Sequence, residues 1–269
     1  MLSAPDVLIV GGGPAGAAAA CRLSRAGQNV LLCERQPKPR PQVCGEFLSA
    51  GACAELADLG VAPLTLGAAP ITHVRLVHGT RQARAPLPFA ACGLSREALD
   101  QQLIARAGER GAHVLRGLAV RRLERTRHAW RVVFGDGATI EASTVLLATG
   151  KHDLRSHRRP RPAAADVIGF KMHWRLAAAQ ASALARHVEL VWFDGGYAGL
   201  QPIENGQANL CLVLSAAAFA RLGRSWSRLL EHLEGSVPHL GARLAGAEAS
   251  WPDPAAIAGV PYGHLHRDG

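Results

Sequence analysis

The amino-acid sequence predicts an α/β protein in which a domain with a parallel sheet is interleaved with an α+β domain built on an antiparallel sheet. Two observations support this fold class. Residues 1–34 contain an apolar strand, a glycine-rich turn, a helix-forming segment and a second strand, in the order of a βαβ unit. Residues 167–214 contain β-forming segments separated by glycine-containing turns, which is typical of antiparallel hairpins.

The composition is that of a folded protein with an excess of positive charge. Hydrophobic residues make up 48% and charged residues 19% of the 269 residues, which argues against disorder and allows one large domain or two interleaved ones. Thirty Lys and Arg residues against twenty-one Asp and Glu residues give a net charge of +9. Only three of these cations are lysines, and the densest basic stretch, Lys151 to Arg161, is interpreted as a solvated loop rather than a phosphate-binding patch. We therefore expect no nucleic-acid partner.

Cysteine usage and the N-terminal sequence bear on the cellular compartment. No two cysteines form a CxxC pair, so neither a zinc site nor a thioredoxin-type redox motif is supported. The N-terminus begins with a predicted strand instead of a charged segment followed by an apolar one, which argues against a signal peptide. The longest apolar stretches fall short of the ~18 residues that a membrane-spanning helix needs. We therefore expect a cytoplasmic protein with reduced thiols at Cys21, Cys33, Cys44, Cys53, Cys92 and Cys211.

The first βαβ unit is predicted from three kinds of segment. Asp6–Val10 is a β-branched run that is typical of a buried parallel strand. The glycine-rich turn Gly11–Gly16 follows at once, and Ala17–Ala26 is rich in helix formers. Gln28–Cys33 is predicted to be the second strand, which ends at Glu34. The turn therefore lies between the end of a strand and the start of a helix, where dinucleotides bind in this arrangement.

Each residue type in this turn has a physical task in binding a dinucleotide. Gly11 permits the tight turn, Gly13 lets a pyrophosphate approach the backbone, and Gly16 lets the helix pack closely on the sheet. The helix N-terminus offers N–H groups and the positive end of its dipole to the phosphates. Glu34 lies at the tip of the second strand, where a carboxylate can accept hydrogen bonds from ribose hydroxyls. A turn that binds nothing is the alternative, but it does not explain this context. The predicted dinucleotide site comprises Gly11, Gly13, Pro14, Ala15, Gly16 and Glu34.

The segment after Glu34 carries a resemblance to a known group of proteins. Gln42–Ser49, which contains Cys44 and Gly45, leads into a helix predicted around residues 50–59. This segment resembles the loop of the geranylgeranyl reductase and aromatic-hydroxylase superfamily of flavoproteins, whose fold is like that of p-hydroxybenzoate hydroxylase. In that superfamily a Cys-Gly or Gly-Arg loop at this point runs alongside the flavin. The resemblance implies that the cofactor is FAD and that Arg35, Cys44 and Gly45 contact it.

The remainder of residues 1–155 extends the resemblance. Leu94–Glu109 is predicted to be a helix with Ser95 as its N-cap, and the superfamily carries an FAD-contacting arginine at its start, which implies this role for Arg96. Strands are predicted at residues 112–115, 120–124, 131–134 and 139–141, with a Gly-Asp-Gly turn before the last of them. A strand over residues 144–150 then ends in Ala-Thr-Gly. By resemblance, Val120, Ala148, Thr149 and Gly150 also contact FAD.

The second half of the chain predicts the antiparallel sheet. Its strands are expected at residues 167–175, 187–193, 197–202 and 208–214, joined partly by Asp-Gly-Gly and Glu-Asn-Gly turns. Residues 72–77 and 81–87 are expected to add two strands, and helices are predicted at 216–234 and 239–244. In the superfamily such a sheet lines the substrate pocket. The expected domains are 1–70 with 93–165 for FAD, and 71–92 with 166–269 on the substrate side. The aromatic side chains and His173 and His187 are interpreted as packing or structural groups, and no catalytic residue and no metal ligand is assigned.

The resemblance implies an FAD-dependent oxidoreductase that acts on a small apolar or aromatic substrate. Our first hypothesis is a monooxygenase that hydroxylates an aromatic or polyketide-like compound with NAD(P)H and oxygen. The alternative is a reductase of isoprenoid double bonds, for which peripheral membrane contact is possible. Halogenases of this group use a lysine in the first third of the chain, and no lysine lies between Lys38 and Lys151, so halogenation is disfavoured.

The superfamily also has a Gly-Asp motif downstream, whose helix N-terminus holds the FAD pyrophosphate. No such motif follows residues 260–263. The chain is therefore expected to be a fragment or a naturally short protein. A truncated, non-catalytic dinucleotide-binding module is accordingly a third possibility for its function.

Overall fold

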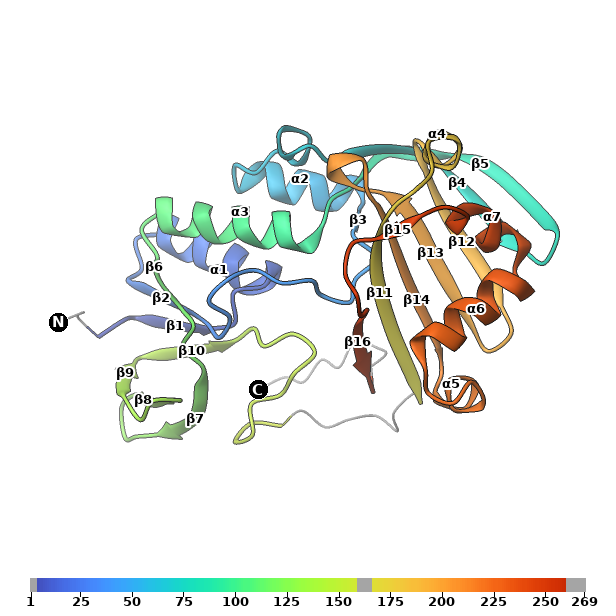
Figure 1. Cartoon of the computed structure of the whole chain (residues 1–269). Helices are drawn as coiled ribbons and strands as arrows, with labels where there is room; N and C mark the ends of the chain where they lie inside the picture. Colours follow the sequence, from blue (N-terminus) through green and yellow to red (C-terminus); the bar gives the residue numbers. More distant parts are fainter. Residues whose placement is uncertain (1–3, 159–165, 260–269) are drawn as a thin grey trace. The chain divides into compact units, whose positions relative to one another are not determined.

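The computed structural model describes residues 4–158 and 166–259 (Figure 1). The chain divides into two compact units. The first unit consists of Met1–Arg40, Glu55–Val61 and Glu97–Pro160, and the second of Pro41–Ala54, Ala62–Arg96 and Arg161–Gly269. The predicted α/β fold class, with a parallel sheet and separate antiparallel sheets, is confirmed.

The first unit is built on a parallel four-stranded sheet with the order β10-β1-β2-β6. Its strands are β1 (Val7–Val10), β2 (Val30–Glu34), β6 (His113–Arg116) and β10 (Thr144–Leu147). The helices α1 (Pro14–Arg25) and α3 (Arg96–Glu109) lie side by side (Figure 1), and the Cys21 thiol of α1 bonds to the Leu103 carbonyl of α3. All four residues of β1 are buried, and strands flank it on both sides.

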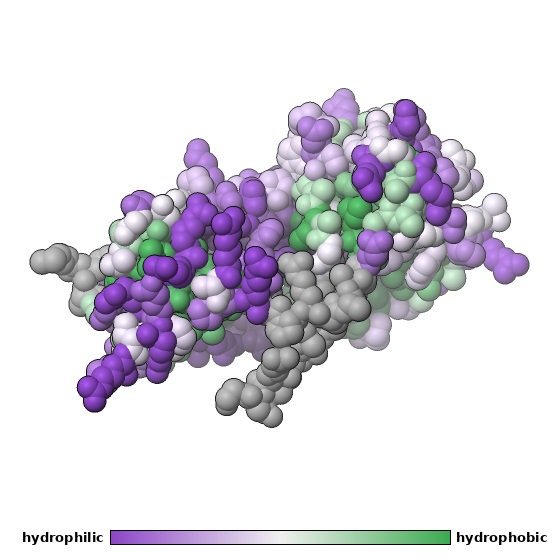
Figure 2. Space-filling view, turned by 90° about the horizontal axis from the view of Figure 1, so that it is seen from below, coloured by the Kyte–Doolittle hydropathy of each residue, from purple (hydrophilic) through white to green (hydrophobic). Residues whose placement is uncertain are grey.

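A three-stranded antiparallel sheet completes the first unit. It consists of β7 (Val120–Arg125), β8 (Trp130–Phe134) and β9 (Thr139–Ala142). The predicted Gly-Asp-Gly turn joins β8 to β9, which confirms that hairpin. Buried Leu123 and Val132 of this sheet share one core with Leu8 and Leu31 of the parallel sheet. Hydrophilic residues cover much of the described surface of this unit in the view of Figure 2.

The second unit is built on a nine-stranded sheet in which β15-β11-β14-β13-β12-β4-β5-β3 are successive neighbours and β16 also pairs with β11. The strands that precede α3 in the chain are β3 (Phe47–Leu48), β4 (Ala69–His78) and β5 (Arg81–Gly93). The others are β11 (Val167–Arg175), β12 (His187–Phe193), β13 (Gly196–Pro202), β14 (Ala208–Ser215), β15 (Glu248–Ala249) and β16 (Ala255–Ala258). The expectation that residues 72–77 and 81–87 join this sheet is confirmed. The sheet is not wholly antiparallel, because β12 and β4 pair in parallel.

One face of this sheet packs against helices of the same unit. Phe170, Met172 and Trp174 of β11 are buried in a core that includes side chains of α5, α6 and α7. The helices are α4 (Ala178–Leu184), α5 (Ala216–Arg221), α6 (Trp226–Ser236) and α7 (Pro238–Leu244), while α2 (Ala50–Asp58) precedes the short 3₁₀ helix η1 (Pro63–Leu66). A second 3₁₀ turn, η2 (Glu204–Gly206), joins β13 to β14. The packing role expected for Phe170 and Trp174 is confirmed.

The prediction of one helix over residues 216–234 was wrong. The segment forms α5 and α6, which are separated at Gly223 and Arg224. Both residues have left-handed backbone conformations, with φ of 68° and 54°, and no α-helix continues through two such residues. Ser225 then caps α6 by accepting a hydrogen bond from the backbone N–H of Arg228. The short helix α4 was not predicted at all.

Candidate functional site

In the glycine-rich turn of the first unit, the backbone of other residues closely approaches two of the glycines. Gly11 has a φ of 111°, and a Cβ on it would lie 2.4 Å from the carbonyl oxygen of Ala148. A Cβ on Gly16 would lie 1.9 Å from the carbonyl oxygen of Gly11. Gly13 is the N-cap of α1 with a φ of −71°, a conformation open to any residue. The backbone therefore requires glycine at positions 11 and 16, whereas the conformation of Gly13 does not.

Glu34 holds this turn directly. Its Oε2 accepts a hydrogen bond from the backbone N–H of Gly12 at 2.7 Å, and its Oε1 accepts one from Gln36 at 2.8 Å. The carboxylate is half-buried at the end of β2, beside the turn. The sequence predicted a ribose-binding carboxylate here but did not reveal this second task, which is to fix the backbone of the glycine turn.

The other predicted cofactor residues of the first unit lie in three different places. Ala148 continues the ladder of β10, because its N–H donates to the carbonyl of Val10 at 2.9 Å, and it lies against Gly11 and Gly16. Thr149 and Gly150 follow it. Arg35 is exposed just after β2. Val120 pairs with Phe134 in the three-stranded sheet and packs against the core there. The structure thus gathers the glycine turn, Glu34 and Ala148, while Val120 belongs to a different sheet.

In the second unit, the loop that resembles the flavin loop lies beside the start of α3. The backbone N–H of Arg96 donates a hydrogen bond of 2.6 Å to Oε1 of Glu46, which directly follows Cys44 and Gly45. Gly45 is exposed, and a Cβ on it would meet nothing within 4 Å. Cys44 is half-buried, and its sulfur accepts a hydrogen bond from the N–H of Glu46. These residues therefore form one local arrangement within the second unit.

A buried charged cluster lies next to this loop. Lys171 and His173 of β11 both contact the carboxylate of Glu46, with Nε2 of His173 at 2.7 Å from Oε2. All three side chains are less than 7% exposed. Burial alone would raise the pKa of Glu46, but the hydrogen bond from His173 and the charge of Lys171 together lower it. The carboxylate is therefore held ionised in the protein interior.

Sequence reasoning missed this cluster, although one signal was present. Lys171 and His173 alternate with Phe170, Met172 and Trp174 along a strand, so the two polar residues share one face of the sheet and the apolar ones share the other. A lysine on an otherwise apolar strand indicates a buried partner of opposite charge. No pattern in the sequence indicates that this partner is Glu46.

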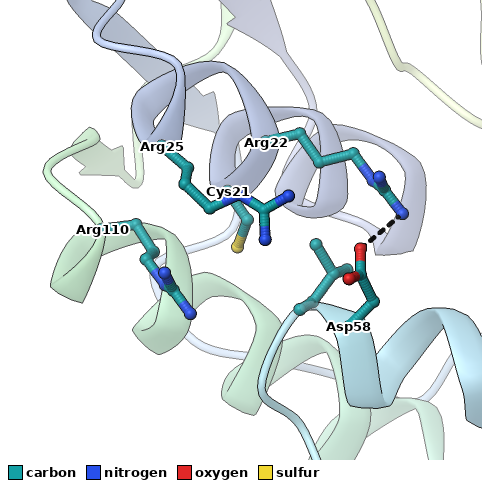
Figure 3. Close-up of a pocket in the computed structure, with 6 residues that line it drawn as sticks. Cys21, Arg22, Arg25, Asp58 and Arg110 are labelled. Carbon is teal, nitrogen blue, oxygen red and sulfur yellow. Dashed lines mark ion pairs between the residues drawn. The ribbon is translucent and has the colours of Figure 1, made fainter.

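A shallow hollow in the first unit lies away from the glycine turn, at the C-terminal end of α1 (Figure 3). Cys21, Arg25 and Arg110 are among the residues that line it, and Arg22 points to Asp58, with which it pairs at 3.2 Å. Burial raises the pKa of the Cys21 thiol, which keeps it protonated. The hollow therefore lacks an activated nucleophile and is not the candidate site.

Residues 4–151 match the pattern of the family described as FAD binding domain. The chain belongs to that family. Among its relatives, the menaquinone reductase of Mycobacterium tuberculosis is 30% identical over 232 residues, which cover 76% of this chain and 54% of that protein. The geranylgeranyl diphosphate reductase of Rhodobacter capsulatus is 36% identical over 175 residues, covering 62% of this chain and 42% of the relative. The chain thus spans about half the length of the curated relatives that it matches.

Solved structures share the fold of this family member. The flavin-dependent brominase Bmp2 has a TM-score of 0.81 at 18% identity, covering 95% of this chain and 67% of the brominase. A flavoprotein/dehydrogenase from Cytophaga hutchinsonii has a TM-score of 0.80 at 20% identity, with 95% and 66% covered. The superfamily resemblance drawn from the sequence is thereby confirmed. Within the described residues, no helix combines the length and apolar character needed to cross a membrane.

Proposed function

We propose that the chain is the FAD-binding part of an oxidoreductase that reduces a double bond in an isoprenoid or isoprenoid-bearing compound. The observation that carries this proposal is the similarity to menaquinone reductases over 76% of the chain, joined by the geranylgeranyl diphosphate reductase. NAD(P)H is the proposed external reductant. The substrate is a small apolar molecule, and peripheral contact with a membrane follows if that molecule resides in lipid.

The residues of the first unit fit the phosphate and ribose of FAD. Gly13, which carries no side chain, is the N-cap of α1, and the N-terminal N–H groups and dipole of this helix would hold the phosphates. Glu34 already holds the turn. Each oxygen of its carboxylate can accept a further hydrogen bond, so the side chain can also bind ribose hydroxyls. We propose that FAD is also contacted by Pro14, Ala15, Gly16, Arg35, Ala148, Thr149 and Gly150. For Val120, a contact with FAD is proposed from the superfamily resemblance alone.

In the second unit we propose that Cys44, Gly45 and Arg96 contact FAD. The open space around Gly45 leaves room for a ring at its backbone. When bound, the flavin supplies hydride transfer, and the protein positions the ring and limits access of water. The residues of this chain are therefore assigned to binding and orientation.

Hydroxylation of an aromatic or polyketide-like compound with NAD(P)H and oxygen is a second candidate. It is favoured by the Cys44–Gly45 loop, which resembles that of aromatic hydroxylases as well as reductases. Oxygen consumption separates the two reactions, because hydroxylation uses one O₂ for each product and double-bond reduction uses none. A protein that retains no flavin would instead support the third possibility, a non-catalytic module.

The test of FAD binding compares wild type with Gly13→Val. We expect wild type to show the flavin absorption bands near ~370 and ~450 nm after purification and loading, since these belong to the oxidised cofactor. Gly13→Val should lose the flavin while remaining folded, because its φ suits any residue but its side chain would occupy the phosphate position. The matched control is Gly108→Ala, where a Cβ meets nothing within 4 Å. Equal flavin content in Gly13→Val and wild type would refute the site.

With FAD bound, the substrate class is tested by adding NADPH and a menaquinone or geranylgeranyl compound, and in parallel an aromatic compound. The reductase proposal predicts a product that is heavier by two hydrogen atoms and is formed without oxygen. A product that contains one oxygen atom from O₂ would replace it with the hydroxylase. NADPH oxidation that forms neither product would leave the chain as a flavin-binding module without either proposed activity.

A further inference from the structure

The backbone at Glu46 is held in a conformation that a residue with a side chain rarely adopts. Its φ of 59° lies in the left-handed region, and its side chain is fully buried. Its carbonyl oxygen accepts a hydrogen bond of 3.1 Å from Leu94, and its Oε1 accepts one from Arg96. A non-glycine residue in this region persists where its surroundings fix it. The surroundings of Glu46 therefore determine the shape of the loop formed by residues 44–46.

The adjacent strands β11 and β14 of the second unit hold each residue of this loop. Lys171 and His173 of β11 bind the Glu46 carboxylate from one side of the sheet. On β14, Asn209 lies directly opposite His173, and its Nδ2 donates to the carbonyl oxygens of Cys44 at 3.1 Å and Gly45 at 2.9 Å. Two carbonyls and one carboxylate are thus bound by three side chains from neighbouring positions of the sheet.

The buried charges of the cluster favour a single conformation of the loop. A buried ion pair contributes little net stability compared with apolar side chains, but a conformation that leaves one buried charge unpaired is strongly disfavoured. Trp251 covers the cluster, with its ring 4.7 Å from the His173 ring and 5.8 Å from Nζ of Lys171. If Glu46 moved away, the Lys171 ammonium would remain beneath this ring without its counter-charge, and Nε2 of His173 would lose its hydrogen-bond partner.

From this geometry we infer that Lys171, His173 and Asn209 are positioning residues that set the Cys44–Glu46 loop in the conformation in which it meets the flavin. The claim that this conformation meets the flavin rests on the proposed FAD site. None of the three needs to touch the flavin, because they act through the Cys44 and Gly45 backbone and the Glu46 carboxylate. Asn209 retains a buried Oδ1 that has no hydrogen-bond partner among the described residues, while its Nδ2 bonds to the two loop carbonyls.

The experiment uses substitutions that keep shape and remove one interaction. His173→Phe keeps a ring under Trp251 but cannot donate to Glu46, whereas His173→Gln keeps a donor at a similar position. Asn209→Asp replaces the donor to the loop carbonyls with a carboxylate oxygen of equal size. The control is Arg175→Met, which removes a cation from an exposed position of the same strand.

Two readouts separate positioning from general stability. The first is the rate at which iodoacetamide alkylates Cys44 in flavin-free protein, measured on the Cys44 peptide by mass spectrometry. We expect His173→Phe and Asn209→Asp to raise this rate about tenfold by releasing the loop to open locally, with His173→Gln and Arg175→Met close to wild type. The second is the visible spectrum of each variant saturated with FAD, which should shift in the first pair and not in the second.

The outcomes distinguish this inference from the proposed function. Unchanged alkylation of Cys44 in folded His173→Phe and Asn209→Asp would overturn the positioning role. Faster alkylation together with an unchanged flavin spectrum would show that the loop is fixed for a purpose other than the flavin. That result would overturn the claim that the loop conformation serves contact with the flavin. A wild-type protein that binds no FAD would refute the proposed function, while the alkylation rates would still decide whether His173 and Asn209 hold the loop.

Discussion

Glu189 offers the sharpest test of how this chain stabilises charge in its interior. Its side chain on β12 is fully buried and binds two guanidinium groups and one imidazole ring. Arg243 of α7 forms a bidentate ion pair with it, with Nη2 at 2.8 Å from Oε1 and Nε at 3.1 Å from Oε2. His239 of α7 lies 2.7 Å from Oε2, and Arg75 of β4 contacts Oε1. The carboxylate thus joins a helix and two neighbouring strands of the second unit.

The magnitude of this interaction follows from the pKa of the carboxyl group. Burial would raise the pKa of Glu189, but the hydrogen bonds and charges of His239 and Arg243 lower it from 4.5 to about 2. A shift of this size corresponds to roughly 3 kcal/mol in favour of the folded state. Because the folded-state pKa is the lower one, this stabilisation is present above pH 4.5 and is lost as the pH falls toward 2. Glu189→Gln should therefore lower the free energy of unfolding at pH 7 by about 3 kcal/mol, since it leaves buried guanidinium groups without their counter-charge.

Urea unfolding followed by circular dichroism measures this change at pH 7 and at pH 3. The difference between wild type and Glu189→Gln should shrink at pH 3, because this pH lies below the ordinary pKa of 4.5, so the carboxyl group of the unfolded chain is protonated there. The control is Glu248→Gln on the exposed strand β15, which should change the free energy of unfolding by less than about 0.5 kcal/mol. A folded Glu189→Gln protein with wild-type stability at pH 7 would refute the reasoning, as would a difference that grows on acidification.

Two further predictions concern the glycine turn. Gly16→Ala should unfold or strongly destabilise the first unit, because its Cβ would lie 1.9 Å from the Gly11 carbonyl oxygen, and thermal unfolding beside the Gly108→Ala control would show this; an unchanged melting temperature would contradict the turn geometry. Glu34→Ala should weaken FAD binding by roughly ten- to a hundredfold, since it removes the charge-assisted hydrogen bonds that fix the turn together with the ribose acceptor. Calorimetric titration with FAD measures this effect, and an affinity equal to that of wild type would leave Glu34 without a role in the site.

The sequence by itself determined the segments whose structure depends on neighbouring residues. The strand before Gly11, the helix after Gly13 and the strand that ends at Glu34 could all be predicted, because apolar runs, helix formers and glycines act over a few residues. The hairpins at Gly137 and Gly195 followed from turn residues for the same reason. The resemblance carried by the Cys44–Gly45 loop added the superfamily, which a local pattern alone does not supply.

Only the tertiary structure decided which distant residues meet. Glu46 is separated from Lys171 by 125 positions and from His173 by 127, and no property of a short segment indicates that these three share one buried site. The same holds for Glu189 with Arg243, and for the parallel pairing of β12 with β4. Whether a charged residue can be buried depends on a partner of opposite charge that removes the cost of leaving water. That partner is brought into place by strand pairing and helix packing between distant segments, so the sequence could predict the glycine turn but not the cluster that holds the Cys44–Glu46 loop.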